Sequence, residues 1–335
     1  MRNYIFVVGS GRCGTTALAD LLGKHSSISH TPELKFFSYA MAERKVYEPL
    51  TFDSTKSFFI EKALGKLLKF RVDLEYRRDD AVQIFSKAVK PDSVEGLSKR
   101  EIYKTIYNLL IESFQDKVSD NVVLQTPNNL YQLDLAREIL GKIKVIGMIR
   151  DPRNFLVSAM RGDRKWYQED VTAIVQWNMS SKYLEKLSKS PDYDYILIKQ
   201  EDFLLKPNEV IDNLSDFLSI DLSPLHEKEK ATVNSSFSSG STNEEILTRY
   251  KKHLNEKDIL RIEYLSEKYM KNNSYGDFSS GFSKIGLSEK ITWKVSYCFS
   301  YLKLKFQIFM RRKGRVDFYF KVRDMIKGHE GERKH

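Results

Sequence analysis

The sequence predicts an α/β fold in three layers, with a mostly parallel central sheet flanked by helices. Short continuous runs of β-prone apolar residues, at 4–8, 122–124, 144–149 and 195–198, have the pattern of buried strands. Segments with helical spacing separate these runs, among them 15–24, 131–140 and 207–218. Strands that alternate with helices are typical of a parallel sheet covered on both faces.

The first strand leads into a glycine-rich turn. The strand at 4–8 is followed by a turn from Gly9 to Gly14 and by a helix that starts at Thr15. The spacing of the two glycines is that of a phosphate-binding loop, whose backbone amides face an anion at the start of a helix. A nucleoside triphosphatase needs Lys after the second glycine, and Thr15 stands there instead. The pattern therefore predicts a turn that binds an anion but does not hydrolyse a nucleoside triphosphate. The alternative is a turn that only connects a strand to a helix and binds no ligand.

Residues 40–120 are mainly helical in pattern and are expected to form a variable helical insert.

A second candidate anion site follows the strand at 144–149. The sequence Arg150-Asp151-Pro152 ends the strand, and Ser158 lies eight residues after the arginine. An arginine grips a phosphate with two parallel hydrogen bonds, and a serine hydroxyl and a helix N-terminus add to that grip. An ordinary turn from strand to helix is the alternative.

The excess of positive charge lies near the end of the chain. The 335 residues have a formal net charge of +10, and residues 289–335 hold 13 Lys and Arg against 5 Asp and Glu. We therefore expect one nearly neutral domain over 1–285 and a basic, amphipathic helical tail over 286–335. One apolar stripe recurs there at steps of three or four residues: Ile291, Val295, Cys298, Leu302, Phe306 and Phe309. Two interpretations stay open, which are contact of 290–327 with an anionic membrane and packing of the stripe on the domain.

Composition disfavours several other classes of protein. No segment approaches the ~20 apolar residues of a membrane-spanning helix. Two cysteines provide no disulfide framework, so a reducing, cytoplasmic location is expected. The six histidines lack the spacing of metal ligands, so no metal is expected, and the chain has no recognised nucleic-acid-binding motif.

Three segments together resemble the family of sulfotransferases that use 3′-phosphoadenosine 5′-phosphosulfate (PAPS). The segment from Gly9 to Thr16 is similar to the family's 5′-phosphosulfate loop, and Arg150 with Ser158 matches its 3′-phosphate site. The segment 30–37 resembles the carbohydrate and heparan-sulfate branch, in a bacterial-like form, where a Glu is followed by two residues and then an aromatic pair. The similarity extends over about residues 3–278 and implies a P-loop-containing version of the three-layer fold.

The resemblance implies a role for each matching residue. Glu33 would be the general base that takes the proton of the acceptor hydroxyl, and Arg12 would stabilise the charge that develops on the transferred group. The residues that would hold PAPS are Gly11, Arg12, Cys13, Gly14, Thr15, Thr16, Arg150 and Ser158. Residues 234–250 loosely resemble the loop that closes over the 3′-phosphate. Two residues depart from the family pattern. Pro32 stands where many relatives have Lys, and Lys35 stands where several relatives have His.

The implied reaction is in-line transfer of a sulfuryl group from PAPS to a hydroxyl, with a carbohydrate or glycan as the expected acceptor and without a metal. Two alternatives are kept. A P-loop kinase that acts on a small molecule would turn over ATP. A non-enzymatic basic adaptor at membranes would need its tail but neither Arg12 nor Glu33.

Overall fold

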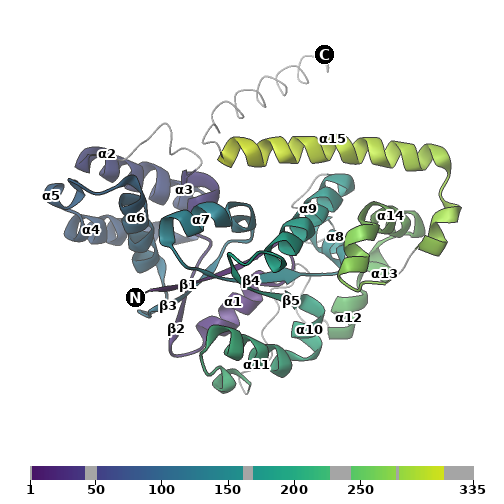
Figure 1. The fold of residues 1–335 in the computed structure, drawn as a ribbon, viewed down its shortest axis with the longest axis horizontal. Helices are drawn as coiled ribbons and strands as arrows, with labels where there is room; N and C mark the ends of the chain where they lie inside the picture. Colours follow the sequence, from purple (N-terminus) through teal and green to yellow (C-terminus); the bar gives the residue numbers. More distant parts are fainter. Residues whose placement is uncertain (1, 42–50, 161–168, 227–242, 277–278, 313–335) are drawn as a thin grey trace, which may run out of the picture. The chain divides into compact units, whose positions relative to one another are not determined.

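The computed structural model describes residues 2–41, 51–160, 169–226, 243–276 and 279–312 (Figure 1). The strands in these ranges are β1 (Asn3–Gly9), β2 (Ile28–Thr31), β3 (Asn121–Gln125), β4 (Lys144–Ile149) and β5 (Asp194–Lys199). They form one sheet in the order β2-β3-β1-β4-β5. The strand β1 pairs in parallel with β3 and β4, and β4 pairs in parallel with β5, which confirms the mostly parallel sheet.

Helices connect the strands. Those up to β4 are α1 (Thr15–Gly23), η1 (Phe36–Ala40), α2 (Phe52–Ser57), η3 (Phe58–Leu64), α3 (Gly65–Phe70), η4 (Val72–Arg77), α4 (Arg78–Ala88), α5 (Pro91–Val94), α6 (Lys99–Phe114), η5 (Pro127–Gln132) and α7 (Leu133–Leu140). Those after β4 are α8 (Pro152–Met160), α9 (Asp170–Ser188), α10 (Gln200–Leu205), α11 (Pro207–Leu218), η6 (Ser223–Leu225), α12 (Asn243–Thr248), α13 (Tyr250–His253), α14 (Glu256–Asn272), η7 (Ser279–Lys284) and α15 (Leu287–Arg312).

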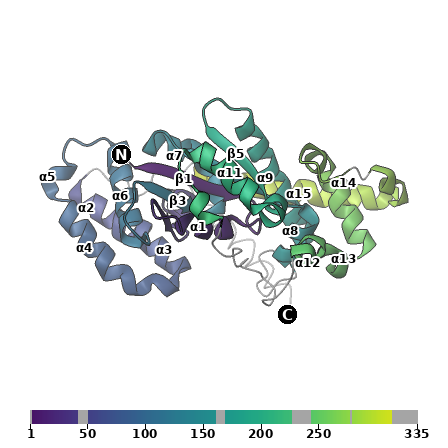
Figure 2. The same cartoon turned by 90° about the horizontal axis from the view of Figure 1, so that it is seen from below.

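Both faces of the sheet are covered, because alternate residues of each strand point to opposite sides. On one face, Ile146 and Met148 of β4 belong to a buried apolar cluster with residues of α1 and α11, among them Leu214. On the other face, Gly147 lies under α9, where a Cβ atom would come within 2.7 Å of Leu184 Cδ2. Figure 1 has α9 above the sheet and α1 and α11 below it, and Figure 2 shows α1 and α11 from their own side. These are the three predicted layers.

The chain divides into two compact units. The first comprises Met1–His30, Ser119–Leu130 and Ile143–Leu304, and it holds β1, β3, β4 and β5. The second comprises Thr31–Val118, Tyr131–Lys142 and Lys305–His335. Its described part from 51 to 114 consists mainly of helices. Residues 42–50 of the insert and 313–335 of the tail lie outside the described ranges, and the division of the chain near residue 285 stays a prediction.

Before β4, the structure differs from the predicted elements at β2 and at α7 in particular. The strand β2 was not predicted, because its sequence Ile-Ser-His-Thr lacks a continuous apolar run. The helix predicted over 131–140 begins only at Leu133, since the preceding residues form the 3₁₀ helix η5. It ends before Gly141, whose positive φ of 88° stops an α-helix. The helix α11 has the predicted bounds.

Candidate functional site

The loop between β1 and α1 has the backbone of an anion-binding turn. Gly11 and Gly14 have φ of 75° and 91°, a left-handed conformation that glycine adopts without strain. Arg12 has φ of 52°, which costs a residue with a side chain roughly 1–2 kcal/mol. A Cβ atom on Gly9 would lie 2.7 Å from Cys13 Sγ. These residues force a tight curve that ends where the first amides of α1 have no acceptor within the helix, so they can bind an anion.

The three residues that follow Arg12 and bear side chains contribute differently. The hydroxyl of Thr15 is buried and accepts a hydrogen bond from Nε2 of Gln125, 3.1 Å away at the end of β3. Thr16 is exposed at the start of α1. The side chain of Cys13 is fully buried, and that burial raises the pKa of its thiol. Cys13 therefore has only its backbone amide available to a ligand.

Arg150 is a buried cation at the end of β4. Its side chain is only 5% exposed, and it donates from Nη1 to the carbonyl of Arg12 at 3.2 Å and from Nη2 to that of Ile246 at 3.5 Å. It forms an ion pair with none of the carboxylates in the described ranges. Burial lowers the pKa of Arg150 to about 10, although the nearby carboxylate of Glu201 opposes that shift in part. A buried guanidinium that donates only to backbone carbonyls is suited to a phosphate, which would neutralise it.

Three of the predicted site residues come together here. Arg12 donates from Nε to the hydroxyl of Ser158 on α8 at 3.2 Å, and its carbonyl accepts from Arg150. Ser158 is buried, and partial burial lowers the pKa of Arg12. The glycine loop and the strand end at Arg150 therefore form one cationic site, although 138 positions separate the two arginines in the sequence.

Three residues that the sequence did not single out support this site. The indole of Trp177, on α9, donates to the carbonyl of Arg150 at 2.8 Å. Glu201, at the start of α10, accepts from the amide of Asp151 at 2.9 Å and from the hydroxyl of Tyr275 at 3.1 Å. Burial raises the pKa of Glu201. Gln125 orients Thr15, and all three residues act by holding the backbone or a hydroxyl of the cationic site.

Glu33 belongs to the second unit and lies just after β2. Its Oε2 forms an ion pair with Nζ of Lys35, a residue with a positive φ of 56°. The side chains of Glu33 and Lys35 are 23% and 14% exposed. Phe36 and Phe37 are fully buried and both pack on the ring of Tyr107, with centroids 4.8 Å apart in each pair. The aromatic pair is therefore anchored on α6 within the second unit, and the role of Glu33 as a base stays a prediction.

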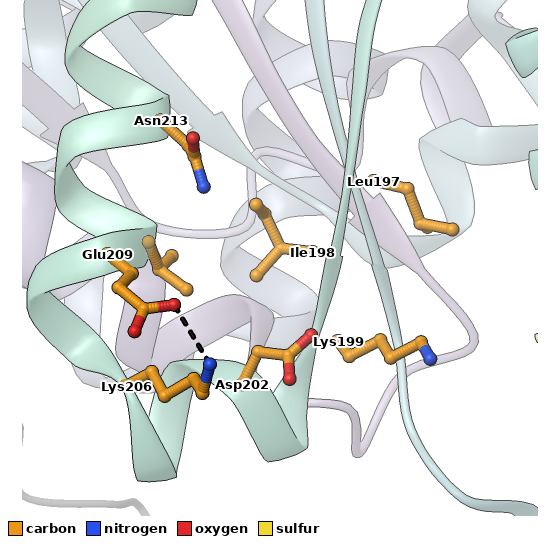
Figure 3. A pocket seen from close by; sticks show the side chains of 8 residues that line it. Leu197, Ile198, Lys199, Asp202, Lys206, Glu209 and Asn213 are labelled. Carbon is orange, nitrogen blue, oxygen red and sulfur yellow. Dashed lines mark hydrogen bonds and ion pairs between the residues drawn. The ribbon is translucent and has the colours of Figure 1, made fainter. Parts of the chain in front are cut away.

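A cavity of about 210 Å³ lies between β5 and the helices α10 and α11 (Figure 3). It is lined by Leu197, Ile198, Lys199, Asp202, Lys206, Glu209, Val210 and Asn213. On the α11 side of this cavity, Lys206 Nζ forms an ion pair with Glu209 Oε2 at 3.1 Å. Because none of the predicted site residues lines this cavity, the candidate site is the cationic cluster at the loop.

The described ranges contain neither a candidate metal centre nor a candidate membrane-spanning helix. No group of three or more His, Cys, Asp or Glu side chains there is arranged to hold a metal ion. None of the helices in those ranges is both long and apolar enough to cross a bilayer.

Comparison with known proteins identifies the family. No curated protein matches the chain. Among solved structures, the sulfotransferase domain from the curacin biosynthetic pathway is 20% identical with a TM-score of 0.53, over 83% of this chain and 99% of that one. The sulfotransferase domain of the Synechococcus PCC 7002 olefin synthase is 18% identical with a TM-score of 0.50, over 80% of this chain and 96% of that one. These similarities establish a shared fold. The model of the sulfotransferase family matches residues 4–224, which include β1 to β5, the glycine loop and Arg150, and the chain therefore belongs to the sulfotransferase family.

Proposed function

We propose that this sulfotransferase uses PAPS as its donor and transfers the sulfuryl group to a hydroxyl of a carbohydrate or glycan. The observation that carries the choice of donor is the buried Arg150, which donates to the carbonyl of Arg12 and forms an ion pair with no carboxylate in the described ranges. The side chain of Arg12 in turn donates to Ser158. A 3′-phosphate would give this guanidinium a direct anionic partner. ATP lacks that phosphate, so the same contact would discriminate against ATP.

Different residues would bind the two ends of the donor. The amides from Gly11 to Thr16 and the hydroxyls of Thr15 and Thr16 would hold the 5′ end of the donor. Arg150 and Ser158 would hold the 3′-phosphate. When bound, PAPS supplies the sulfuryl group and a bisphosphate leaving group. Arg12 would exchange its hydrogen bond with Ser158 for contacts to the donor, where it would stabilise negative charge that develops during transfer.

The acceptor side of the proposal rests on the segment from Glu33 to Phe37. Glu33 would take the proton of the acceptor hydroxyl while that oxygen forms its bond to sulfur and the bond from sulfur to the leaving oxygen breaks. Since Oε2 of Glu33 pairs with Lys35, Oε1 is the oxygen that would receive the proton. The resemblance of this segment to carbohydrate sulfotransferases supports a glycan acceptor. We place the reaction in the cytoplasm, with the basic tail at the inner face of a membrane.

Thermal unfolding in the presence of nucleotides tests the donor. We expect adenosine 3′,5′-bisphosphate, at about 100 times its Kd, to stabilise the folded protein by ~2.7 kcal/mol and so to raise the unfolding temperature. ATP at the same concentration should produce little shift, and transfer of label from PAPS to a glycan mixture should identify the acceptor. Equal shifts with both nucleotides would contradict the role of the 3′-phosphate, and turnover of ATP would support a kinase instead.

Trp177→Phe tests whether the buried indole positions Arg150. The change leaves the Arg150 carbonyl unpaired and opens a small cavity, so we expect a loss of about 2–4 kcal/mol in stability. We also expect roughly tenfold weaker binding of the bisphosphate by calorimetry. Trp293→Phe is the matched control, because Trp293 is also buried but packs on Tyr264 of α14, with ring centroids 6.3 Å apart. Trp293→Phe should lower stability without lowering the affinity for the bisphosphate. Equal losses of affinity in both variants would contradict the positioning role of Trp177.

A further inference from the structure

The helix α15 exposes a row of large apolar side chains. The α15 stripe is defined here as five residues that recur at steps of three or four and are each between 49% and 75% exposed: Leu287, Ile291, Val295, Phe299 and Leu302. Phe306 and Phe309 continue the same spacing and are 42% and 52% exposed. A row of this length is unusual on a surface that meets only water, because apolar groups of that size favour burial.

The opposite face of α15 packs on α9 and α14, within the first unit. Trp293 is 7% exposed and contacts the ring of Tyr264. The hydroxyl of Tyr297 accepts a hydrogen bond from Nδ2 of Asn178, 3.1 Å away on α9. These contacts fix the rotation of the helix about its axis. The sequence-based alternative that the stripe packs on the domain is therefore wrong for the described residues, and the stripe points outward.

Lysines border the α15 stripe. At 3.6 residues per turn, one edge of the stripe carries Lys290 and Lys305, and the other edge carries Lys303. Lys294 also lies on the first edge, but its Nζ is over the ring of Tyr264 on the packed face, 5.3 Å from the centroid. The helix from Leu287 to Arg312 contains a single acidic residue, Glu289, whose carboxylate is paired with Lys257 at 2.5 Å. The border of the stripe therefore has a net positive charge.

We propose that the α15 stripe docks on the surface of an anionic lipid bilayer, with the helix axis parallel to the membrane plane. The apolar side chains would enter the boundary between headgroups and acyl chains, and the lysines would contact anionic headgroups. A second copy of this chain fits less well, since two stripes packed together would bring their rows of lysine close without acidic partners from α15. The proposal concerns binding and does not rest on sulfuryl transfer, so either can fail without the other.

Sedimentation of the full chain with vesicles tests the proposal. We expect the protein to bind vesicles of phosphatidylcholine with about 30% phosphatidylserine far more tightly than vesicles of phosphatidylcholine alone, and less tightly as salt rises. The double variant Ile291→Ser/Phe299→Ser should bind at least roughly tenfold more weakly, because two large apolar side chains no longer enter the bilayer. Lys290→Gln/Lys303→Gln should weaken binding roughly tenfold and reduce its salt dependence.

Val118→Ser is the matched control, since Val118 is an apolar residue of the second unit that is 89% exposed, and it should leave vesicle binding unchanged. Sedimentation equilibrium without lipid tests whether a second copy or another part of the chain covers the α15 stripe instead. A dimer that Ile291→Ser/Phe299→Ser dissociates would overturn the proposal in favour of a second copy. A monomer that binds neither kind of vesicle would overturn the proposal as well, and would indicate that another part of the chain covers the α15 stripe. Equal binding to neutral and anionic vesicles would contradict the role of the lysines.

Discussion

Glu33→Gln is expected to lower kcat by about three orders of magnitude while leaving the Kd for adenosine 3′,5′-bisphosphate unchanged. A carboxylate that accepts a proton in the transition state contributes typically ~10²–10⁴ in rate, and glutamine has nearly the same shape but accepts no proton at neutral pH. The amide oxygen of glutamine can still accept a hydrogen bond from Lys35, so the loop after β2 should keep its conformation. Turnover of labelled PAPS and calorimetry with the bisphosphate measure the two quantities.

The matched control for this variant is Glu95→Gln. Glu95 is exposed in the second unit, so the same chemical change there should alter neither kcat nor nucleotide binding. If Glu33→Gln retained more than a tenth of the wild-type kcat, another group would have to be the base. Loss of turnover in Glu33→Gln with normal nucleotide binding would also exclude the basic adaptor, for which Glu33 is dispensable.

The local chemistry of the donor site was predictable from the sequence, because it depends on short segments. Glycines at 9, 11 and 14 predict a turn that needs left-handed backbone, and two of these positions have positive φ. Arg150 directly after a buried strand predicts an arginine at a sheet edge. That Arg12 and Arg150 meet depends instead on the strand order, which places β1 beside β4 with Gly9 opposite Met148. Strand order is a long-range property that the spacing of apolar residues does not determine.

The supporting residues were harder to predict from the sequence, because their contacts also depend on the tertiary structure. Trp177 has the pattern of an ordinary core residue of a helix, and only the tertiary structure brings its indole to the carbonyl of Arg150. Gln125 had a usable signal, because it is a polar residue at the carboxyl end of a buried strand, where open α/β sheets bind their ligands. The register sets it opposite Val7, two residues before the loop begins. The stripe on α15 was predicted with Cys298, but its outward direction depends on Trp293 and the contacts of the opposite face.

Arg150→Ala is the second change with a large expected effect, and its target is donor affinity. We expect the Kd for adenosine 3′,5′-bisphosphate to rise by about two to three orders of magnitude, since a buried, charge-assisted contact to phosphate contributes ~2–5 kcal/mol. The affinity for adenosine 5′-phosphate, which lacks the 3′-phosphate, should change much less. Calorimetry with both nucleotides gives the comparison, and an equal loss for both would assign Arg150 to the adenosine or the 5′ end.

Stability distinguishes a binding arginine from a structural one. Arg150 is buried without a carboxylate partner in the described ranges, so its removal takes away a buried charge and leaves only two backbone carbonyls to find water. Arg261 is also largely buried but pairs with Asp170 at 2.6 Å and with Asp258 at 3.0 Å. Arg261→Ala leaves two carboxylates uncompensated and should cost about 3 kcal/mol in stability with no effect on the nucleotide. Arg150→Ala should lose less stability than Arg261→Ala in the absence of ligand, and added bisphosphate should stabilise it much less than the wild type. The reason is that Glu201 compensates the buried charge of Arg150 only in part until an anion binds.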